Sequence, residues 1–176
     1  MKLGVYVGSF NPVHKGHIQI VRYLLDKKYI DKVLIIPTKE YWNKTNLAPL
    51  EDRINMLKYY ETDDIKVDIT HNNYEFTYEI LRSIKKEYNC NPCLIIGSDN
   101  LKKLDLWKNI DEILRYKIIV LKREKENKFK QTKKNITIID DWKIIKASST
   151  EVRNGNTDLL DKPVYEYIKK KKLYNL

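Results

Sequence analysis

The sequence predicts an α/β fold in which one doubly wound parallel sheet carries helices on both faces. Short runs of Ile, Val and Leu alternate along the chain with segments whose apolar residues recur every three or four positions, as in amphipathic helices. The short runs are mostly apolar throughout, which is typical of strands buried on both faces of a parallel sheet. The sequence has no internal repeat and no Gly-, Ser- or Pro-rich linker, so residues 1–176 are expected to form one domain.

The first half of the chain contains three expected strands separated by two expected helices. Residues 3–7 form a mainly apolar run, and residues 18–25 place their apolar side chains on one helical face. Residues 33–36 are apolar throughout and stop at a proline, which cannot donate to a sheet. Helical spacing returns over residues 50–57, and residues 65–69 alternate like a strand with one polar face.

The second half repeats the pattern. Its expected elements are a helix over residues 76–88, a strand over 94–96, a helical stretch over 101–114, strands over 118–121 and 136–139, and a closing helix over 164–172. Right-handed crossovers between parallel strands then give a Rossmann-like arrangement. Such sheets bind ligands at the carboxyl ends of their strands, so the residues after each strand are the place to look for chemistry.

The composition is that of a folded globular protein, with 42% hydrophobic and 33% charged residues. No apolar run approaches the roughly 20 residues that span a bilayer, and residues 1–7 reach glycine too early for a signal peptide. Cys90 and Cys93 lie between an expected helix and an expected strand, the reverse of the order in a redox pair, so we expect reduced thiols. These features predict a cytoplasmic protein that does not enter membranes.

The charge balance indicates an anionic partner. The formal net charge is +10 and the sequence pI is about 9.4. Nucleic acid and a polyphosphate substrate are both compatible with it, although most of the lysines are expected to be solvated. The role of the basic segment over residues 122–134 is left open.

The first strand is followed by Gly8-Ser9-Phe10-Asn11-Pro12-Val13-His14-Lys15-Gly16-His17, which opens a helix. Free N–H groups at a helix start attract phosphate, and His14 and His17 add donors there. Gly8 lets the backbone approach a ligand, and Gly16 is expected to leave room above the helix. The same stretch also fits a Gly/Pro turn whose histidines only cap the helix, or half of a metal site.

A second polar helix start follows the last expected strand. Ser148, Ser149 and Thr150 are good N-terminal caps, but their hydroxyls can also donate to phosphate. Arg153 lies one turn further along, where its planar guanidinium can bind phosphate oxygens. Two such helix starts in one α/β domain predict a site for a nucleoside triphosphate.

Together the two segments resemble the His-x-Gly-His nucleotidyltransferases, which are relatives of the class I aminoacyl-tRNA synthetases. The first family motif is similar to residues 8–17, and the second is similar to Ser148-Ser149-Thr150-x-x-Arg153. Further segments resemble the bacterial nicotinate mononucleotide adenylyltransferases: Ile95-Ile96-Gly97-Ser98-Asp99, Leu104-x-x-Trp107, Phe76-Thr77, Pro163-Val164-x-x-Tyr167-Ile168 and Leu173-Tyr174. This resemblance covers essentially the whole chain.

The resemblance implies transfer of AMP from ATP to nicotinate mononucleotide, giving deamido-NAD and pyrophosphate. It assigns the ATP side to Gly8, Ser9, Phe10, His14, Gly16, His17, Gly97, Asp99, Ser148, Ser149, Thr150 and Arg153. It assigns the nicotinate nucleotide to Thr77, Trp107, Lys44 and Arg123, although Trp107 also fits an ordinary core position and Arg123 a solvated one. His14, His17, Lys44 and Arg153 are the expected catalytic residues.

One segment departs from the resemblance. After the second strand the family usually has a Pro-Pro-His-Lys type of loop, whereas this chain has Pro37-Thr38-Lys39-Glu40-Tyr41-Trp42-Asn43-Lys44. Either Lys44 or Lys39 can be the loop lysine that contacts phosphate. The next stretch, residues 49–53, is similar to phosphopantetheine adenylyltransferases, which remain the alternative acceptor class. The sequence leaves open the choice between nicotinate and nicotinamide mononucleotide, and the oligomeric state.

The chemistry expected from these residues is in-line attack of the acceptor phosphate on the α-phosphorus of ATP, without a covalent intermediate. Mg²⁺ is expected to enter with ATP, because the motifs contain no carboxylate cluster for a dedicated metal site. A different class of function is a basic nucleic-acid-binding module, since the chain has 13 tyrosines that could stack on bases. No recognisable RNA-binding motif accompanies them, so nucleic acid is not the expected partner.

Overall fold

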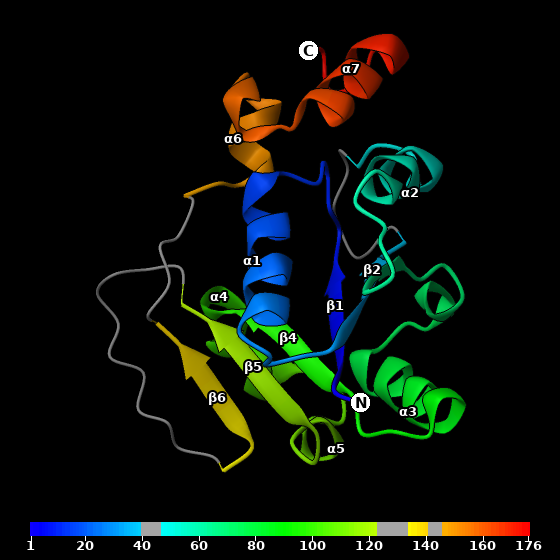
Figure 1. Ribbon diagram of the computed structural model, residues 1–176, viewed down its shortest axis with the longest axis vertical. Coiled ribbons are helices and arrows are strands. Elements are labelled where there is room, and N and C mark those ends of the chain that lie inside the picture. The colour runs from blue at the N-terminus through cyan, green and yellow to red at the C-terminus, as the bar shows by residue number, and fades with distance from the viewer. Residues whose placement is uncertain (40–46, 123–133, 141–145) are drawn as a thin grey trace.

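The computed structural model describes residues 1–39, 47–122, 134–140 and 146–176. Within them, six strands form one parallel sheet in the order β3-β2-β1-β4-β5-β6 (Figure 1). The strands are β1 (Leu3–Gly8), β2 (Lys32–Pro37), β3 (Ile65–Val67), β4 (Cys93–Gly97), β5 (Lys117–Leu121) and β6 (Ile136–Ile139). Because the order reverses direction between β1 and β4, the crevice at the carboxyl ends of these two strands is the expected binding place. The predicted doubly wound sheet is confirmed.

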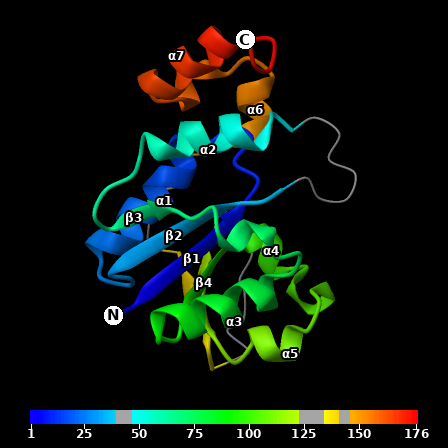
Figure 2. The ribbon, with the colours of Figure 1, turned by 90° about the vertical axis from the view of Figure 1, so that its right-hand side faces the viewer.

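Helices cover both faces of the sheet. They are α1 (Lys15–Asp26), α2 (Leu50–Lys58), α3 (Thr77–Tyr88), α4 (Ser98–Leu101), α5 (Ile110–Ile113), α6 (Ser149–Arg153) and α7 (Lys162–Lys171), with 3₁₀ turns η1 (His71–Asn73), η2 (Leu104–Leu106) and η3 (Thr157–Leu159). Apolar residues of α1, α2 and α7 pack in one core, and those of α3 and α5 pack in a second core. Figure 2 shows α1 and α2 on one side of the sheet and α3 and α5 on the other.

The strands supply both cores by alternation. In β2, Val33 and Ile35 belong to the first core, whereas Leu34 and Ile36 belong to the second. Successive side chains of a strand point to opposite faces, so a run that is apolar throughout is buried twice. This is the physical reason why short apolar runs in the sequence predicted these strands.

The prediction of one helical stretch over residues 101–114 is wrong. The chain instead forms the short elements α4, η2 and α5, with Trp107 in an extended conformation (φ −74°, ψ 141°) and Asn109 left-handed at φ 54°. Leu104 and Ile113 are buried in the second core, so their spacing reflects separate turns that each place one side chain on the sheet. The break brings Trp107 to a cavity that is described below.

The strand expected over residues 65–69 ends earlier, at Val67. The carboxylate of Asp68 accepts the backbone N–H groups of Thr70 (2.8 Å) and His71 (3.0 Å), which turns the chain out of the sheet. Both cysteines are free thiols, and burial raises the pKa of Cys93 to about 11, so this thiol stays protonated. None of the helices in the described ranges is long and apolar enough to cross a membrane.

Candidate active site

The two polar helix starts meet at the carboxyl end of β1. The guanidinium of Arg153 donates to the carbonyl oxygen of Asn11 at 2.6 Å, and the hydroxyl of Ser149 donates to the carbonyl oxygen of Pro12 at 2.8 Å. Figure 1 accordingly shows α6 next to the start of α1. Segments that lie more than a hundred positions apart in the sequence therefore form one structure around the β1–α1 loop.

His14 and His17 lie at the start of α1 with stacked rings, whose centroids are 3.6 Å apart. His14 precedes the helix and is 1% exposed, whereas His17 is half-buried. Nδ1 of His17 accepts the backbone N–H of His14 at 3.2 Å. A ring nitrogen that accepts this bond carries no proton, so Nε2 of His17 is the protonated nitrogen and a hydrogen-bond donor.

Phe10, Gly8 and Gly16 pack against the inner side of this loop. The ring of Phe10 is 2% exposed and packs edge-on against His17, with centroids 5.0 Å apart. A Cβ on Gly16 would come within 3.1 Å of both Ala147 and the His14 ring, and one on Gly8 within 3.1 Å of Phe10. Gly16 thus allows protein segments to approach one another, where the sequence suggested room for a ligand. The side chain of Phe10 acts as core support for His17.

Ser148 caps α6, because its hydroxyl oxygen accepts the backbone N–H of Glu151 at 3.1 Å. The hydroxyl oxygen of Thr150 accepts from the guanidinium of Arg153 at 3.2 Å. The Ser149 hydroxyl thus makes the contact with the first loop, and the Ser148 hydroxyl donates to the Glu151 carboxylate at 3.0 Å, so the proton of each is already engaged. Helix α6 has five residues, which are too few for its dipole alone to bind an anion. An anion at this helix would therefore have to be bound mainly by the charge of Arg153.

A cavity of about 490 Å³ opens beside this loop, at the carboxyl ends of β1, β2 and β4. Gly8 and Ser9 line one side of it, and Thr77, Trp107 and Lys108 line another. The cavity has the size of a small-molecule site, and it lies at the reversal of the strand order, where α/β sheets bind ligands. Thr77 is the first residue of α3, so N–H groups of that helix start lie at the cavity.

The Trp107 segment is attached to α3 by a paired contact. Arg82 donates from Nε and Nη2 to the two carboxylate oxygens of Glu112 in α5, at 2.9 and 2.6 Å. The hydrogen bond from Arg82 lowers the pKa of the Glu112 carboxyl, which is thus ionised at neutral pH. A bidentate pair fixes orientation as well as distance, so it helps hold the two walls of the cavity together.

The remaining predicted residues lie as follows. Gly97 is buried at the end of β4 and precedes α4, and Asp99 is exposed; neither lines the cavity. Lys44 and Arg123 lie outside the described residues. The ammonium of Lys39 donates to the side-chain oxygen of Asn73 in η1, next to the cavity wall. The structure therefore joins the β1–α1 loop to α6 and places Gly8 and Ser9 of that loop in one cavity with Thr77 and Trp107. His14, His17, Arg153 and Asp99 lie outside the lining of that cavity.

Arg53 is a site residue that the sequence analysis missed. It is fully buried at 0% exposure, and its guanidinium donates to the carbonyl oxygens of Ser9 (2.8 Å), Thr38 (2.8 Å) and Ala48 (3.0 Å). It thereby fixes the segments that follow β1 and β2 at the cavity. The signal was present, because Arg53 occupies the apolar face of α2 between Leu50 and Leu57.

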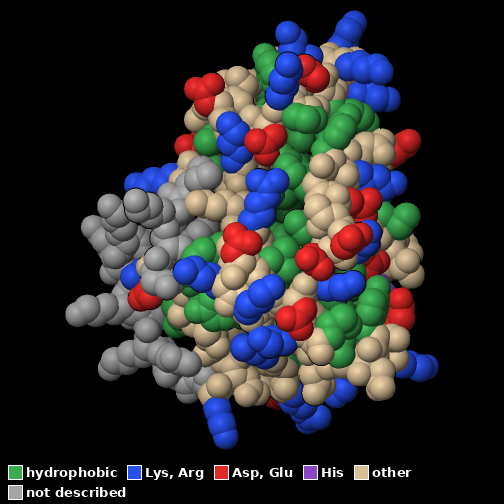
Figure 3. Space-filling model, in the orientation of Figure 1, with side chains coloured by type: hydrophobic (Ala, Val, Ile, Leu, Met, Phe, Trp, Pro, Cys, Tyr) green, Lys and Arg blue, Asp and Glu red, His purple; other side chains and the backbone are tan. Residues whose placement is uncertain are grey.

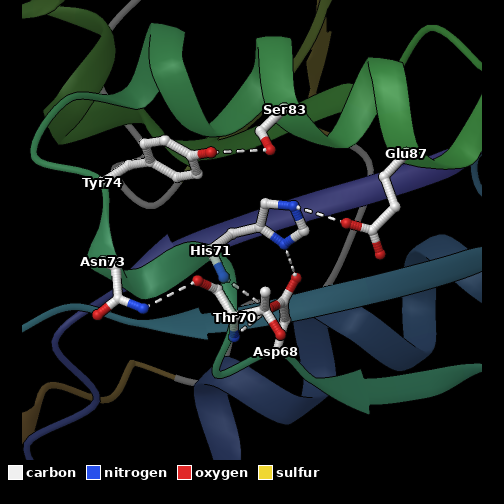
Figure 4. Close-up of polar contacts among 7 residues, drawn as sticks. All are labelled: Asp68, Thr70, His71, Asn73, Tyr74, Ser83 and Glu87. Carbon is white, nitrogen blue, oxygen red and sulfur yellow. Dashed lines mark hydrogen bonds and ion pairs between the residues drawn. The ribbon is translucent and has the colours of Figure 1, made fainter.

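His71 is a second missed residue, and Figure 4 shows its surroundings. Its Nδ1 lies 2.5 Å from a carboxylate oxygen of Asp68, and its Nε2 lies 3.3 Å from a carboxylate oxygen of Glu87 on α3. His71 is 1% exposed, and its neighbours Asn72 and Tyr74 line the cavity. The histidine therefore joins the end of β3 to α3 behind the cavity wall.

This fold and site together define a nucleotidyltransferase of the cytidylyltransferase-like class, whose family model matches residues 5–155. A "probable nicotinate-nucleotide adenylyltransferase" of Fusobacterium nucleatum is 34% identical, with 88% of this chain and 86% of the relative covered. A protein of the same description from Caldicellulosiruptor bescii is 31% identical, with 99% of both chains covered. The chain belongs to the cytidylyltransferase-like family and, within it, to the nicotinate-nucleotide adenylyltransferases.

Solved structures agree with this fold. The Plasmodium falciparum nicotinic acid mononucleotide adenylyltransferase complexed with NaAD superposes with a TM-score of 0.83 over 99% of this chain and 97% of that chain. The two sequences are 18% identical, so this likeness concerns the fold.

Proposed function

We propose that this enzyme transfers the AMP group of ATP to nicotinate mononucleotide, forming nicotinate adenine dinucleotide and pyrophosphate. The phosphate oxygen of the mononucleotide forms a bond to the α-phosphorus of ATP, and the bond from that phosphorus to the bridging oxygen breaks. The observation that carries the proposal is the convergence of residues 8–17 and 148–153 beside the cavity that Thr77 and Trp107 line.

No general base is needed, because the attacking phosphate is already ionised at neutral pH. Catalysis then depends on holding the two substrates in line and on stabilising the negative charge that gathers on the α-phosphate. His17 has a protonated Nε2 and a ring fixed by Phe10 and by the N–H of His14, so it is suited to donate to that phosphate. The His14 ring stacks on the His17 ring, and His14 is proposed to help hold the phosphates.

Arg153 and residues 148–150 are proposed to hold the β- and γ-phosphates and the leaving pyrophosphate. To donate to them, the hydroxyls of Ser148 and Ser149 exchange their present acceptors, Glu151 and Pro12. An arginine has five N–H donors, so Arg153 can keep its bond to Asn11 and still bind phosphate oxygens. Gly97 and Asp99 remain proposed contacts of the adenosine half. Lys44 and Arg123 remain proposed contacts of the mononucleotide, and Lys39 is the rival of Lys44 as the loop lysine.

We propose that Mg²⁺ enters as part of the Mg–ATP complex. Among the described residues, no three His, Cys, Asp or Glu side chains gather in a way that could hold a metal ion, and the proposal assigns the ion to the phosphates of ATP. The ion, when bound, neutralises charge on the phosphates. A cytoplasmic location, where ATP and the mononucleotide are both found, stays a prediction.

Pyrophosphate release tests the proposed reaction. We expect release with ATP and nicotinate mononucleotide, and little with phosphopantetheine; nicotinamide mononucleotide in a third arm measures the selectivity for the carboxylate. Equal or faster release with phosphopantetheine would favour the alternative acceptor. No release with any acceptor, together with salt-sensitive binding to single-stranded nucleic acid, would favour the non-catalytic alternative. On the face shown in Figure 3, however, Lys and Arg are interspersed with Asp and Glu and form no single basic patch.

Replacing Trp107 by alanine is expected to raise the KM for nicotinate mononucleotide about tenfold or more, with a much smaller effect on the KM for ATP. Stacking on an aromatic ring is worth about 1–3 kcal/mol per base, and about 1.4 kcal/mol corresponds to a factor of ten in affinity. Steady-state kinetics with each substrate varied in turn measures the effect. Leu106→Ala is the matched control, because Leu106 is the neighbouring residue and is 85% exposed. Equal changes in both KM values would assign Trp107 a structural role.

Replacing His71 by alanine is expected to raise the KM for nicotinate mononucleotide several-fold and to lower the free energy of unfolding by about 1–3 kcal/mol, because the buried Asp68 carboxylate loses a hydrogen-bond partner. His71→Asn keeps a donor near the Nδ1 position and should restore most of both losses. Kinetics and urea denaturation of the two variants measure these effects. An unchanged KM in the destabilised His71→Ala protein would show that His71 does not position the cavity wall.

A further inference from the structure

The C-terminal tail after α7 turns back onto the body of the protein. Lys172 ends the helix in the left-handed region (φ 53°), and the N–H of Leu173 donates to the carbonyl oxygen of Ile168 at 3.0 Å. Leu173, Tyr174 and Leu176 pack against the first core. Tyr174 itself has φ 59°, a conformation that is unfavourable for a bulky residue and persists where contacts of the side chain hold it.

The hydroxyl of Tyr174 reaches the β1–α1 loop. It donates to the side-chain oxygen of Asn11 at 2.8 Å, across 163 positions of the sequence. The same oxygen accepts the backbone N–H of Ala48 at 2.9 Å, and Asn11 is 3% exposed. Burial raises the pKa of Tyr174, so its hydroxyl remains a protonated donor throughout the neutral range.

Asn11 is therefore the meeting point of three separate segments. Its side chain accepts from Tyr174 and Ala48, and its backbone carbonyl accepts from Arg153 at 2.6 Å. The next residue, Pro12, accepts from Ser149. Any movement of Asn11 would thus displace the loop that carries His14 and His17 together with the guanidinium of Arg153.

We propose that Tyr174 is a positioning residue for ATP, which acts through Asn11 on the loop and on Arg153. The inference rests on the proposed function of that loop. Tyr174 does not line the cavity, so it is not proposed to contact either substrate. Its hydroxyl orders the triphosphate side of the site directly through Asn11, whereas it reaches the acceptor side more remotely, through Ala48 and Arg53, so we expect the effect on ATP to be the larger one.

A second tyrosine in the same part of the chain provides a matched control. The hydroxyl of Tyr167, in α7, donates to Asp52 (2.7 Å) and accepts from Asn55 (3.1 Å), both on α2. Tyr167→Phe therefore removes a hydroxyl with two hydrogen bonds, but none of them involves the β1–α1 loop. It should lower Tm at least as much as Tyr174→Phe does.

The experiment compares Tyr174→Phe with Tyr167→Phe in the full chain. For Tyr174→Phe we expect a KM for ATP about 5- to 10-fold higher and a KM for nicotinate mononucleotide within about twofold of wild type. The Kd of α,β-methylene-ATP, measured by calorimetry, should rise about 5- to 10-fold as well, since one hydrogen bond is worth about that factor. For Tyr167→Phe we expect no change in either ATP parameter.

Three outcomes would overturn the proposal: an unchanged ATP affinity in Tyr174→Phe, equal changes for both substrates, or the same loss in Tyr167→Phe. Calorimetry separates this test from the proposed reaction. If wild-type protein binds the ATP analogue but does not use nicotinate mononucleotide, the acceptor assignment fails, whereas the difference between the two tyrosine variants still decides the role of Tyr174.

Discussion

Replacing His17 by alanine is expected to lower kcat by about 10²–10³, the usual cost of removing one preorganised donor to developing charge. The structure supports this magnitude, because the His17 ring is fixed on three sides. Its Nδ1 accepts from the N–H of His14, its face stacks on the His14 ring, and it meets the Phe10 ring in a T-shaped contact. The protonated Nε2 is the donor that we assign to a phosphate. The alanine substitution would therefore remove from the transition state a donor that is already held in position.

The fold should survive this change. The variant loses the acceptor for one backbone N–H, which is worth about 1 kcal/mol, and the ring contacts with His14 and Phe10, whereas the sheet and both cores keep their other side chains. Circular dichroism and thermal unfolding check this, and single-turnover kinetics with saturating substrates measures the chemical step. His17→Gln retains an N–H donor near the Nε2 position and should fall between wild type and alanine. A kcat within about twofold of wild type in a folded His17→Ala protein would remove His17 from the mechanism.

The parts of the fold that the sequence predicted are those in which burial dictates composition. A strand such as residues 33–36 is apolar on both faces because the sheet is covered twice, and that requirement is visible locally. The prediction of a helix over residues 101–114 failed because the local pattern did not determine the structure there. Its apolar residues are separated by helical intervals, but the extended Trp107 and left-handed Asn109 divide it. Tertiary packing decided this local structure: Leu104 and Ile113 are buried in the second core, and Arg82 of α3 pairs with Glu112.

The candidate site was predictable where polar residues interrupt a pattern, as in the two helix starts. The sequence predicted that the two helix starts share one triphosphate site, but not how they touch. The hydrogen bonds between them run to backbone carbonyls of Asn11 and Pro12, which no side-chain motif encodes. The interpretation of Gly16 shows the same limit. The sequence indicates that a side chain is not tolerated there, but only the structure identifies Ala147 and His14 as the neighbours.

Replacing Arg53 by methionine is expected to cost about 3–5 kcal/mol of the free energy of unfolding, a large part of the roughly 5–15 kcal/mol of a typical domain. Methionine has a similar length, so the cavity it leaves is small, and the loss comes from three carbonyl oxygens that lose a charged donor in the interior. Because two of these carbonyls belong to Ser9 and Thr38, both at the cavity, activity should fall as well. Urea denaturation and pyrophosphate release measure the two effects.

Two further variants separate the geometry of Arg53 from its charge and from helix propensity. Arg53→Lys keeps the charge, but an ammonium cannot reproduce the planar fork that reaches three oxygens, so most of the loss should remain. Lys58→Met makes the same kind of change at an exposed position of the same helix and should stay within about 0.5 kcal/mol of wild type. If Arg53→Lys were as stable as wild type, the charge alone would suffice, and the three carbonyl contacts would not be what fixes the ends of β1 and β2. If Arg53→Met were no worse than Lys58→Met, the apolar face of α2 would tolerate either residue, and the segments around the cavity would have to be held by the sheet itself.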